Sequence, residues 1–425
     1  MRILLASDLY FPVINGVSVF TRNLAQGLTE RGHTVAIIAP SQSMNREIEF
    51  EDEVTIYRTR GVIFPFYQNI RLSLSPNIEV RRIIKDFQPD VIHVQMPLGI
   101  GQAAMSVAEH YRIPIVSTSH AMPENLMDNL KRLSAFSRPI NYMIREWGRH
   151  FHNKADTITS PTQSGLNSFG KHAQNLKKPV KIISNGINLK KFSPGTVDEA
   201  LYDKYRLPKD KPILVYVGRL DAEKHIDVVL HAFTRVRQET DAHLLLIGKG
   251  LEEDSLKQSA RDLGITAAVT FAGFVPEEDK IALEKAGHIF VIASPVELQC
   301  IAALEAMASG MPVVAVNAGA LPELCQNGKN GLTFDLDDDQ EASDNILTIL
   351  SDAALWKKYS EGSLKIANSH DLEHTLDDFE ALYKEVIGCK VKLVGRKKRI
   401  ILGKALPKPL RSKISARKKV SPVKS

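Results

Sequence analysis

Residues 292–323 have the sequence IASPVELQCIAALEAMASGMPVVAVNAGALPE, and this stretch decides the fold. An apolar run over 289–293 predicts a buried parallel strand that ends at Ser-Pro. Residues 299–309 are rich in Ala, Leu, Glu and Met and predict a helix, which a Gly-Met-Pro sequence ends before a second strand over 313–316. This order of strand, loop, helix and strand indicates an α/β fold with a parallel sheet.

Two carboxylates frame this unit. Glu297 falls in the loop after the strand and Glu305 falls inside the helix. Ligands of open α/β sheets bind at the carboxyl ends of the strands, and the free N–H groups of residues 298–301 at the helix start would attract a phosphate. A nucleotide sugar offers a phosphate to the amides and hydroxyls to the carboxylates. The alternative is that Glu297 only caps the helix and Glu305 is a solvated helix residue.

Length and composition limit the class of protein. A chain of 425 residues with 44% hydrophobic residues predicts two or three globular domains. The three cysteines are scattered, without a metal-binding or disulfide pattern, which is typical of the cytosol. The apolar run before Asp8 is too short for a signal peptide, and no apolar segment reaches the roughly 18 residues of a membrane span.

Charge is distributed unevenly along the chain. Residues 390–425 contain 14 Lys and Arg and no Asp or Glu, so removing them from the net charge of +6 leaves a body at −8. Such a basic segment with few aromatic residues is predicted to be disordered. It could hold nucleic acid or an anionic membrane face, or it could be a solvated extension without a partner.

The first half of the chain repeats the strand and helix pattern. A strand over 2–7 and a helix over 17–31 flank a loop with Gly16, where a phosphate could approach the backbone; the alternative is an ordinary tight turn. A later strand over 114–119 is followed directly by His120. This histidine is therefore expected at the ligand-binding edge of the sheet, as a functional or a structural residue.

Residues 126–154 predict a mostly helical segment with two different faces. One face carries Arg138, Arg145, Arg149 and His152, and the other carries Ile140, Met143, Ile144, Trp147 and Phe151. A basic and aromatic amphipathic helix can lie on a membrane surface. The alternative is that the apolar stripe packs on the domain core and the arginines are merely solvated.

A second series of strands and helices begins at 213–217, after a polar stretch at 195–212 that reads as a hinge. Its first strand leads into Arg219 and Lys224, two cations in a strand-to-helix loop. Because this loop and the Glu297 loop belong to the same edge of one sheet, both are expected to converge on one diphosphate.

The chain therefore divides into four expected segments. They are an N-terminal domain at 1–194, a C-terminal domain at 195–371, a C-terminal helix at 372–389 that packs back towards the N-terminal domain, and the basic tail at 390–425.

Asp335-Leu336-Asp337 matches the metal-binding DxD signature of some sugar transferases. It lies in an acidic run before a helix, so we interpret it as a helix start with carboxylates at the positive end of the dipole. No His/Cys cluster suggests zinc, and neither a Walker A sequence nor a hydrolase serine motif is present. We therefore expect no metal.

These motifs together resemble the retaining GT-B glycosyltransferases of family 4, over about residues 1–388. Besides Glu297 and Glu305 with the Gly310-Met311-Pro312 sequence, the matching stretches are Asn15-Gly16-Val17, Gly32-His33-Thr34-Val35, Pro89-Asp90-Val91-Ile92-His93, Ser119-His120, Ser184-Asn185-Gly186-Ile187, Gly218-Arg219-Leu220, Glu223-Lys224 and Gly273-Phe274-Val275. The resemblance implies two Rossmann-like, doubly wound domains facing a cleft.

The resemblance also implies roles for individual residues. Glu297 would contact hydroxyls of the donor sugar, Glu305 the ribose, and His120 would lie near the reacting sugar carbon. Arg219 and Lys224 would hold the diphosphate. The remaining donor contacts would come from the backbone of Gly16, Val275, Leu298, Gln299, Cys300 and Ile301. Many members of the family have glycine where Cys300 stands, and because backbone amides bind the phosphate, the small cysteine is expected to be tolerated.

The resemblance is strongest to bacterial enzymes that glycosylate diacylglycerol or phosphatidylinositol, on the stretches 120–125 and 297–301. It implies transfer of a hexose, with glucose from UDP-glucose as the expectation, to a membrane lipid, without cofactor or metal. The protein would lie on the cytoplasmic face of the membrane through 126–154 and 390–425, and no nucleic-acid partner is expected. The alternatives are a soluble or polyprenyl-linked glycan acceptor, and a non-catalytic nucleotide-sugar sensor.

Overall fold

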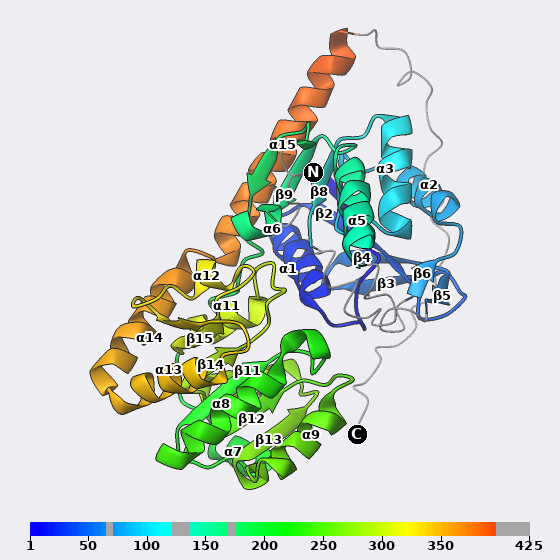
Figure 1. Cartoon of the computed structure of the whole chain (residues 1–425). Helices are drawn as coiled ribbons and strands as arrows, with labels where there is room; N and C mark the ends of the chain where they lie inside the picture. Colours follow the sequence, from blue (N-terminus) through cyan, green and yellow to red (C-terminus); the bar gives the residue numbers. More distant parts are fainter. Residues whose placement is uncertain (65–70, 121–136, 168–174, 397–425) are drawn as a thin grey trace.

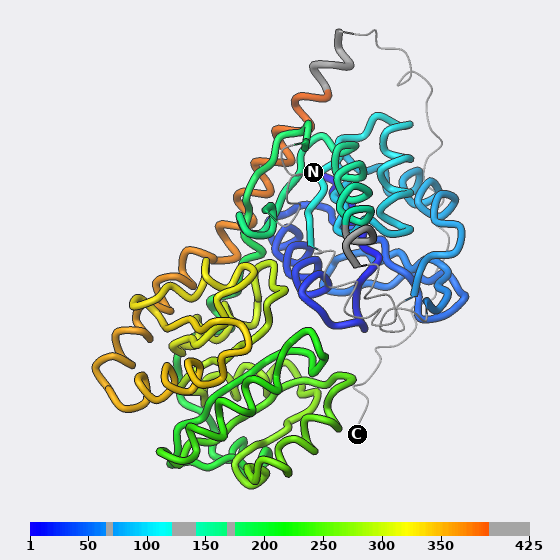
Figure 2. The backbone as a smooth tube through the Cα atoms, viewed as in Figure 1, coloured from blue at the N-terminus to red at the C-terminus, as the bar shows by residue number. Residues whose placement is uncertain are grey.

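The computed structural model describes residues 1–64, 71–120, 137–167 and 175–396. Two parallel sheets flanked by helices form two α/β domains, one above the other in Figure 1. A long C-terminal helix runs from the lower domain along the upper one (Figures 1 and 2). None of the described helices is both long enough and apolar enough to cross a bilayer.

The N-terminal sheet has eight strands in the order β10-β9-β8-β7-β1-β2-β4-β3. They are β1 (Arg2–Ala6), β2 (Thr34–Pro40), β3 (Glu47–Glu51), β4 (Val54–Thr59), β7 (Val91–Val94), β8 (Ile115–Thr118), β9 (Thr157–Ser160) and β10 (Val180–Ile182). The pairs are parallel except for β3 with β4. A separate antiparallel pair, β5 (Gly61–Ile63) and β6 (Arg71–Ser73), was not predicted.

Helices cover both faces of this sheet, since its central strands are buried on both faces along almost their whole length. They are α1 (Gly16–Glu30), α2 (Pro76–Phe87), α3 (Gly99–Tyr111), α5 (Ser137–His152) and the short α6 (Gln163–Asn167). Phe20 of α1 is in the core on one face of the sheet, and Ile83 of α2 is in the core on the other. Phe151, which was expected on the apolar face of an amphipathic helix, is 1% exposed in this second core.

The C-terminal sheet has six parallel strands in the order β13-β12-β11-β14-β15-β16. They are β11 (Ile213–Val217), β12 (His243–Ile247), β13 (Val269–Gly273), β14 (Ile289–Ile292), β15 (Val313–Val316) and β16 (Gly331–Phe334). The order reverses between β11 and β14, so the loops after these two strands flank the switch point where open sheets bind ligands. The loops after β11 and β14 are the ones that carry Arg219, Lys224 and Glu297.

The helices of the C-terminal half include three α-helices and two short 3₁₀ helices that were not predicted. The set is α7 (Glu199–Tyr205), η3 (Ala222–Lys224), α8 (Ile226–Glu239), α9 (Glu253–Asp262), η4 (Thr266–Ala268), α10 (Glu277–Lys285), α11 (Ile301–Ala308), α12 (Leu321–Leu324), α13 (Asp339–Ser351), α14 (Ala353–Asn368) and α15 (Leu372–Arg396). The expected hinge at 195–212 contains α7, capped by Asp198. The short α12 and the longer α14 were not predicted either, and α14 contacts α11 and α13.

Two of the helix boundaries that differ from the expected ones concern the candidate site and the basic tail. The helix expected at 299–309 begins at Ile301, because Cys300 has a left-handed φ of 60° and cannot be part of it. The basic tail was expected to be disordered from Lys390, but α15 continues to Arg396. Lys390 stabilises this extension through an ion pair of 2.7 Å with Asp156. Residues 397–425, the rest of the tail, lie outside the described residues.

The chain passes between the two domains through two short segments, which lie side by side. Ile187 and Asp371 form a parallel bridge, with the N–H of Ile187 donating to the carbonyl of His370 at 2.8 Å. Beyond this bridge, α15 packs on the N-terminal domain, where Phe379 and Tyr383 are in one core with Phe20. We refer to residues 184–187 and 370–372 as the crossover segments.

Candidate active site

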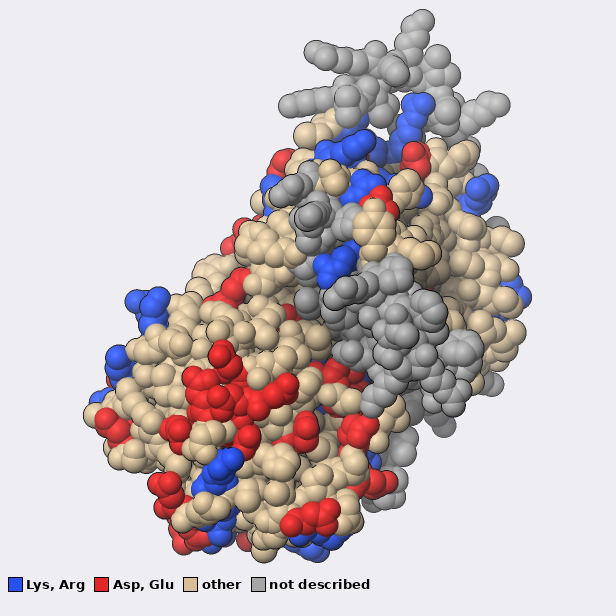
Figure 3. Space-filling model, viewed as in Figure 1, with Lys and Arg blue, Asp and Glu red and all other residues tan. Residues whose placement is uncertain are grey.

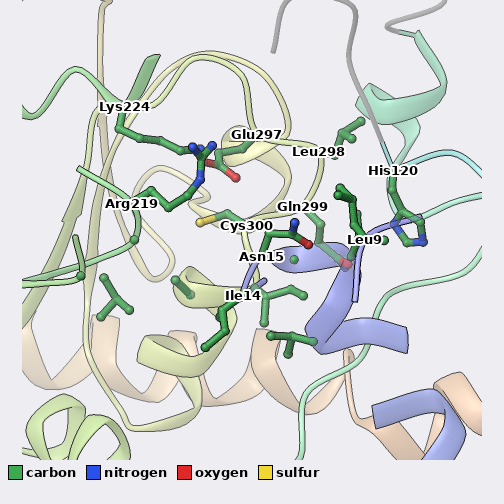
Figure 4. Close-up of a pocket in the computed structure, with 18 of the residues that line it drawn as sticks. Leu9, Ile14, Asn15, His120, Arg219, Lys224, Glu297, Leu298, Gln299 and Cys300 are labelled. Carbon is green, nitrogen blue, oxygen red and sulfur yellow. The ribbon is translucent and has the colours of Figure 1, made fainter. Parts of the chain in front are cut away.

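A cavity of about 700 Å³ lies between the two domains. Its lining includes Gly16, His120, Arg219, Lys224, Val275, Glu297, Leu298, Gln299, Cys300, Ile301 and Glu305. The structure therefore brings the nominated residues of both domains to one place. In Figure 4, Arg219, Lys224 and Glu297 are grouped on one side of the cavity, and His120 lies on the other.

Lys224 and Glu297 form an ion pair at this cavity. Lys224 ends η3, and its Nζ lies 2.7 Å from Oε1 of Glu297. Burial acts to raise the pKa of Glu297, but Lys224 and Ser294 outweigh it and hold the pKa below the usual value of a carboxyl. Burial likewise acts to lower the pKa of Lys224, and Glu297 reverses the shift. Both groups are therefore charged near neutral pH.

Arg219 is held by carboxylates of its own loop. Its guanidinium forms ion pairs with Asp221 and Glu223, while its carbonyl accepts a hydrogen bond of 2.9 Å from the Tyr216 hydroxyl. Sequence reasoning nominated Arg219 but neither of these carboxylates. Their effect is to fix the direction of the guanidinium, which lowers the entropy cost of binding an anion with it.

Glu305 also has a cationic partner that the sequence did not reveal. Its Oε2 lies 2.6 Å from Nζ of Lys280 in α10. One turn further along α10, Glu284 is fully buried. Burial raises the pKa of Glu284 well above the usual value of a carboxyl, Lys280 opposes the shift and Glu305 adds to it. Lys280 is thus paired with Glu305, next to a carboxyl that stays protonated.

The segment 297–300, which we call the donor loop, leads from β14 to α11. Among the described residues, the backbone N–H groups of Leu298, Gln299 and Cys300 donate to no other group of the protein. They lie at the cavity, at the start of α11, where a helix attracts anions. Free backbone N–H groups of this kind are the hydrogen-bond donors that a diphosphate requires.

Helix α1 brings a second helix start to the cavity. Gly16 is its first residue, and Asn15 forms a capping box with Ser18. A Cβ added at Gly16 would lie 3.9 Å from the side chain of Ile301, the first residue of α11. The N-termini of α1 and α11 therefore face the same space from different domains, which adds positive potential there.

His120 follows β8 on the N-terminal side of the cavity. Its Nε2 lies 2.8 Å from Oε1 of Gln95, an acceptor, so the ring carries its proton on Nε2 and leaves Nδ1 unprotonated. Burial, followed by the effect of His152, lowers the pKa of His120 to about 3. His120 is therefore a neutral polar group at pH 7. Gln95 was not found by sequence reasoning, because it lies on a different strand end.

The acidic signature at 335–337 precedes α13, and Oδ1 of Asp337 lies 3.4 Å from Nδ1 of His225, the residue after Lys224. The carboxylate of Asp338 accepts a hydrogen bond from the N–H of Glu341 and caps the helix, in agreement with the predicted helix start. Within the described part of the chain, no group of three or more His, Cys, Asp or Glu side chains is placed to hold a metal ion.

Two family descriptions match the chain, one for each half. Residues 14–191 match "Glycosyltransferase Family 4" and residues 197–365 match "Glycosyl transferases group 1". The gap between the two matches lies between β10, a strand of the N-terminal sheet, and β11, a strand of the C-terminal sheet.

Curated relatives and solved structures agree with these matches. The chain is 28% identical over 320 residues to the alpha-monoglucosyldiacylglycerol synthase of Streptococcus pneumoniae, covering 74% of this chain and 71% of that protein. It is 26% identical to a GDP-mannose-dependent alpha-mannosyltransferase of Mycolicibacterium smegmatis, covering 79% of this chain and 85% of that protein. Sucrose-phosphate synthase from Thermosynechococcus elongatus shares the fold, with a TM-score of 0.76 at 18% identity over 92% of this chain and all of that one. The protein belongs to the GT-B glycosyltransferases of family 4, and it transfers a sugar from a nucleotide sugar.

Proposed function

We propose that this protein transfers glucose from UDP-glucose to a membrane lipid such as diacylglycerol, with retention of the anomeric configuration. The observation that carries the proposal is the asymmetry of the cavity. Its C-terminal wall bears the charged groups, whereas its N-terminal wall is predominantly apolar. The apolar residues are Leu9, Ile14, Val17, Val19, Phe64, Leu72, Met96 and Leu98. An apolar wall suits an acceptor with a hydrocarbon part better than a free sugar.

The charged wall suits a nucleoside diphosphate sugar. Arg219 and the amides of the donor loop supply hydrogen-bond donors for the diphosphate. Lys224 supplies a second cation, which is paired with the carboxylate of Glu297. Glu297 would give up its ion pair with Lys224 and accept hydrogen bonds from hydroxyls of the sugar. Glu305 would accept hydrogen bonds from hydroxyls of the ribose. The lysine freed by this exchange would then turn to the phosphate.

The proposed retention rests on the resemblance to the retaining family 4 enzymes, and the groups at the cavity bear on the route that such a transfer would take. His120 is neutral, and its described side-chain partner is the amide of Gln95. This is not the arrangement of a base and an orienting carboxylate that activates a covalent nucleophile. In a front-face transfer the acceptor hydroxyl attacks from the side that the diphosphate leaves. The departing phosphate takes the hydroxyl proton, and Arg219 and Lys224 stabilise its charge.

A lipid acceptor also requires access to a membrane surface. Helix α5 exposes three large side chains, Tyr142 at 61%, Met143 at 68% and Trp147 at 43%. His152, expected on the basic face, is instead buried and bonded to Ser117 at 2.9 Å, so the expected face is smaller than predicted. The side chain of Arg138 lies outside the described residues.

Figure 3 shows acidic side chains gathered on the lower domain and Lys and Arg at the top of the upper domain near α15.

The named relatives support both a glucolipid product and an alternative. One is called an alpha-monoglucosyldiacylglycerol synthase, and another a GDP-mannose-dependent alpha-mannosyltransferase. A mannosyl donor, or a soluble or polyprenyl-linked glycan acceptor, is therefore the second candidate. The apolar cavity wall favours the lipid over a free glycan, but it does not discriminate between the two donors.

The experiment is a partition assay. The purified protein is incubated with radiolabelled UDP-glucose or GDP-mannose and a bacterial envelope extract that has been separated into lipid and aqueous fractions. We expect label from UDP-glucose in the chloroform-soluble fraction, with diacylglycerol as the consumed acceptor. Label from GDP-mannose alone, or label only in the aqueous fraction, would establish the second candidate instead. The Glu297→Gln variant controls for contaminating enzymes.

A further inference from the structure

The side chain of Gln299 leaves the donor loop and ends between the two crossover segments. It is 1% exposed. Its Oε1 accepts a hydrogen bond of 2.8 Å from the N–H of Asn185, and its Nε2 donates to Oγ of Ser184 at 2.7 Å. The same Nε2 lies 3.3 Å from Nδ1 of His370. One amide thus contacts both connections between the domains.

The partners of Gln299 are themselves joined. Oγ of Ser184 lies 2.8 Å from Nδ1 of His370, and it also accepts a hydrogen bond from the N–H of Gly186. Burial lowers the pKa of His370, so Nδ1 of the neutral ring can accept from Ser184. In this arrangement the Ser184 hydroxyl donates to His370 and accepts from Gln299 and Gly186. A closed network of this kind holds its members in fixed positions.

The crossover segments have little freedom of their own. Gly186 has a φ of 75°, and a Cβ at this position would lie 2.7 Å from Oγ1 of Thr375 and 2.9 Å from Cα of Leu372. The hydroxyl of Thr375 donates to the carbonyl of Ser184 at 3.1 Å. Relative rotation of the domains has to pass through these packed segments. Any such rotation changes the positions of the three groups that hold Gln299.

Leu298 adds a second cross-domain contact to the same loop. Its carbonyl accepts a hydrogen bond of 2.6 Å from Oγ1 of Thr162, which precedes α6 of the N-terminal domain. Within the described parts of the chain, the neighbouring Glu297 and Cys300 have no hydrogen bond to the N-terminal domain; Glu297 is paired with Lys224 inside its own domain. The two middle residues of the donor loop, Leu298 and Gln299, are therefore tied to the other domain while the whole loop lines the cavity.

We propose that Gln299 is a positioning residue that couples nucleotide binding at the donor loop to the conformation of the crossover segments. The inference rests on the proposed function only in that a nucleoside diphosphate occupies the donor loop. A ligand that orders residues 297–300 orders the Gln299 amide, and the amide transmits this to Asn185, Ser184 and His370. Because coupling is reciprocal, the crossover conformation equally sets the affinity of the loop for nucleotide.

The test is hydrogen exchange of the full-length chain with and without UDP or GDP, read at peptides that cover 184–187 and 370–372. In the wild type we expect nucleotide to slow exchange at the crossover segments by about tenfold, the size of one to two net hydrogen bonds. In Gln299→Leu, nucleotide should still protect 301–305, but protection of the crossover segments should fall below about twofold. Gln299→Glu keeps the acceptor for Asn185 and should be intermediate.

Two further variants make the outcome decisive. Gln326→Leu removes an amide of the same domain that bonds the carbonyl of Glu323 and contacts neither crossover segment, so it should respond as the wild type does. If Gln299→Leu fails to fold, His370→Ala interrupts the same network from the other side. Equal crossover protection in Gln299→Leu and wild type would overturn the proposal. Absence of protection at 301–305 in the wild type with both nucleotides would instead contradict the proposed donor site, and with it this coupling.

Discussion

Nζ of Lys224 lies 2.7 Å from Oε1 of Glu297, so the cation nominated for the diphosphate and the carboxylate nominated for the sugar neutralise each other. Their side chains are only 14% and 16% exposed. A nucleotide sugar supplies an anion for the first and hydroxyls for the second, and it can therefore separate the pair without leaving a buried charge unpaired. The pair makes this part of the cavity neutral and suited to a ligand of that composition.

We predict that Lys224→Met and Glu297→Gln each lower kcat about 100-fold, because each removes an electrostatic contact made at the reacting groups. The double variant should lose much less than the product of the two effects, since each single change also leaves the other member of a buried pair alone. Steady-state kinetics and thermal unfolding of the three variants measure this.

The matched control for this pair is Lys257→Met. Lys257 forms an ion pair of 2.6 Å with Glu253 on the surface of α9, where such pairs contribute little. Its kcat should remain within about twofold of the wild type. Near-normal turnover of Lys224→Met or Glu297→Gln would show that the pair is not part of the reaction site.

The second prediction concerns the pH dependence of the rate. A histidine with a pKa lowered to about 3 is neutral throughout pH 5–8, so its titration cannot shape the activity profile in this range. We expect His120→Asn to lower kcat about 100-fold through loss of a positioned polar group, while the shape of the profile stays the same. An acidic limb near pH 6.5 in the wild type that disappears in His120→Asn would contradict a neutral His120.

The parallel strands could be predicted closely because each is a short apolar run between turn residues. Helix α14 was not predicted, because its buried face consists of Tyr359, Ser363 and Ala367, and two of these are small. Strand β3 was also missed, although its sequence Glu-Ile-Glu-Phe-Glu alternates polar and apolar residues as a strand does. Its apolar residues Ile48 and Phe50 are 48% and 74% exposed in the structure, so this alternation does not mark a buried face.

The residues of the site were nominated from motifs, but their partners were not. Lys280 reaches Glu305 across 25 positions of sequence, and Gln299 reaches Ser184 across 115. Contacts between such distant segments depend on the packing of whole elements, which periodicity does not encode. Gln299 in particular was nominated for its backbone, and the structure shows that its side chain serves the crossover segments.

The third prediction concerns metal. Activity should survive EDTA, because Arg219, Lys224 and two helix N-termini are positioned to stabilise the leaving diphosphate, and because Asp338 of the acidic run is engaged as a helix cap. The assay is turnover after chelation and gel filtration. Loss of activity that manganese or magnesium restores would contradict this, and Asp335→Asn with Asp337→Asn would then locate the ion.

The fourth prediction concerns membrane binding by two separate elements. Truncation after Arg396 keeps the ion pair of Lys390 with Asp156 and removes only the later cations, each worth about 1 kcal/mol near an anionic surface. It should weaken sedimentation with phosphatidylglycerol vesicles at low salt and have little effect at high salt. Trp147→Ser should weaken binding at both salt concentrations, because it removes apolar insertion.

Leu336→Ser is the control for this experiment, since Leu336 is 46% exposed on the other domain. It should bind vesicles as the wild type does. Unchanged sedimentation of both the truncation and Trp147→Ser would contradict membrane binding by these two elements and favour the glycan acceptor.

The most direct measurement follows sugar transfer in a defined system. The purified chain is given ¹³C-labelled UDP-glucose and phosphatidylglycerol vesicles that contain diacylglycerol, and the product is extracted and analysed by NMR. The account predicts a chloroform-soluble glucolipid with an α-anomeric carbon, formed by the wild type and reduced about 100-fold in Glu297→Gln. A β-anomer would contradict retention. Label that remains in UDP-glucose or appears only as free glucose, with diacylglycerol present, would contradict the lipid acceptor.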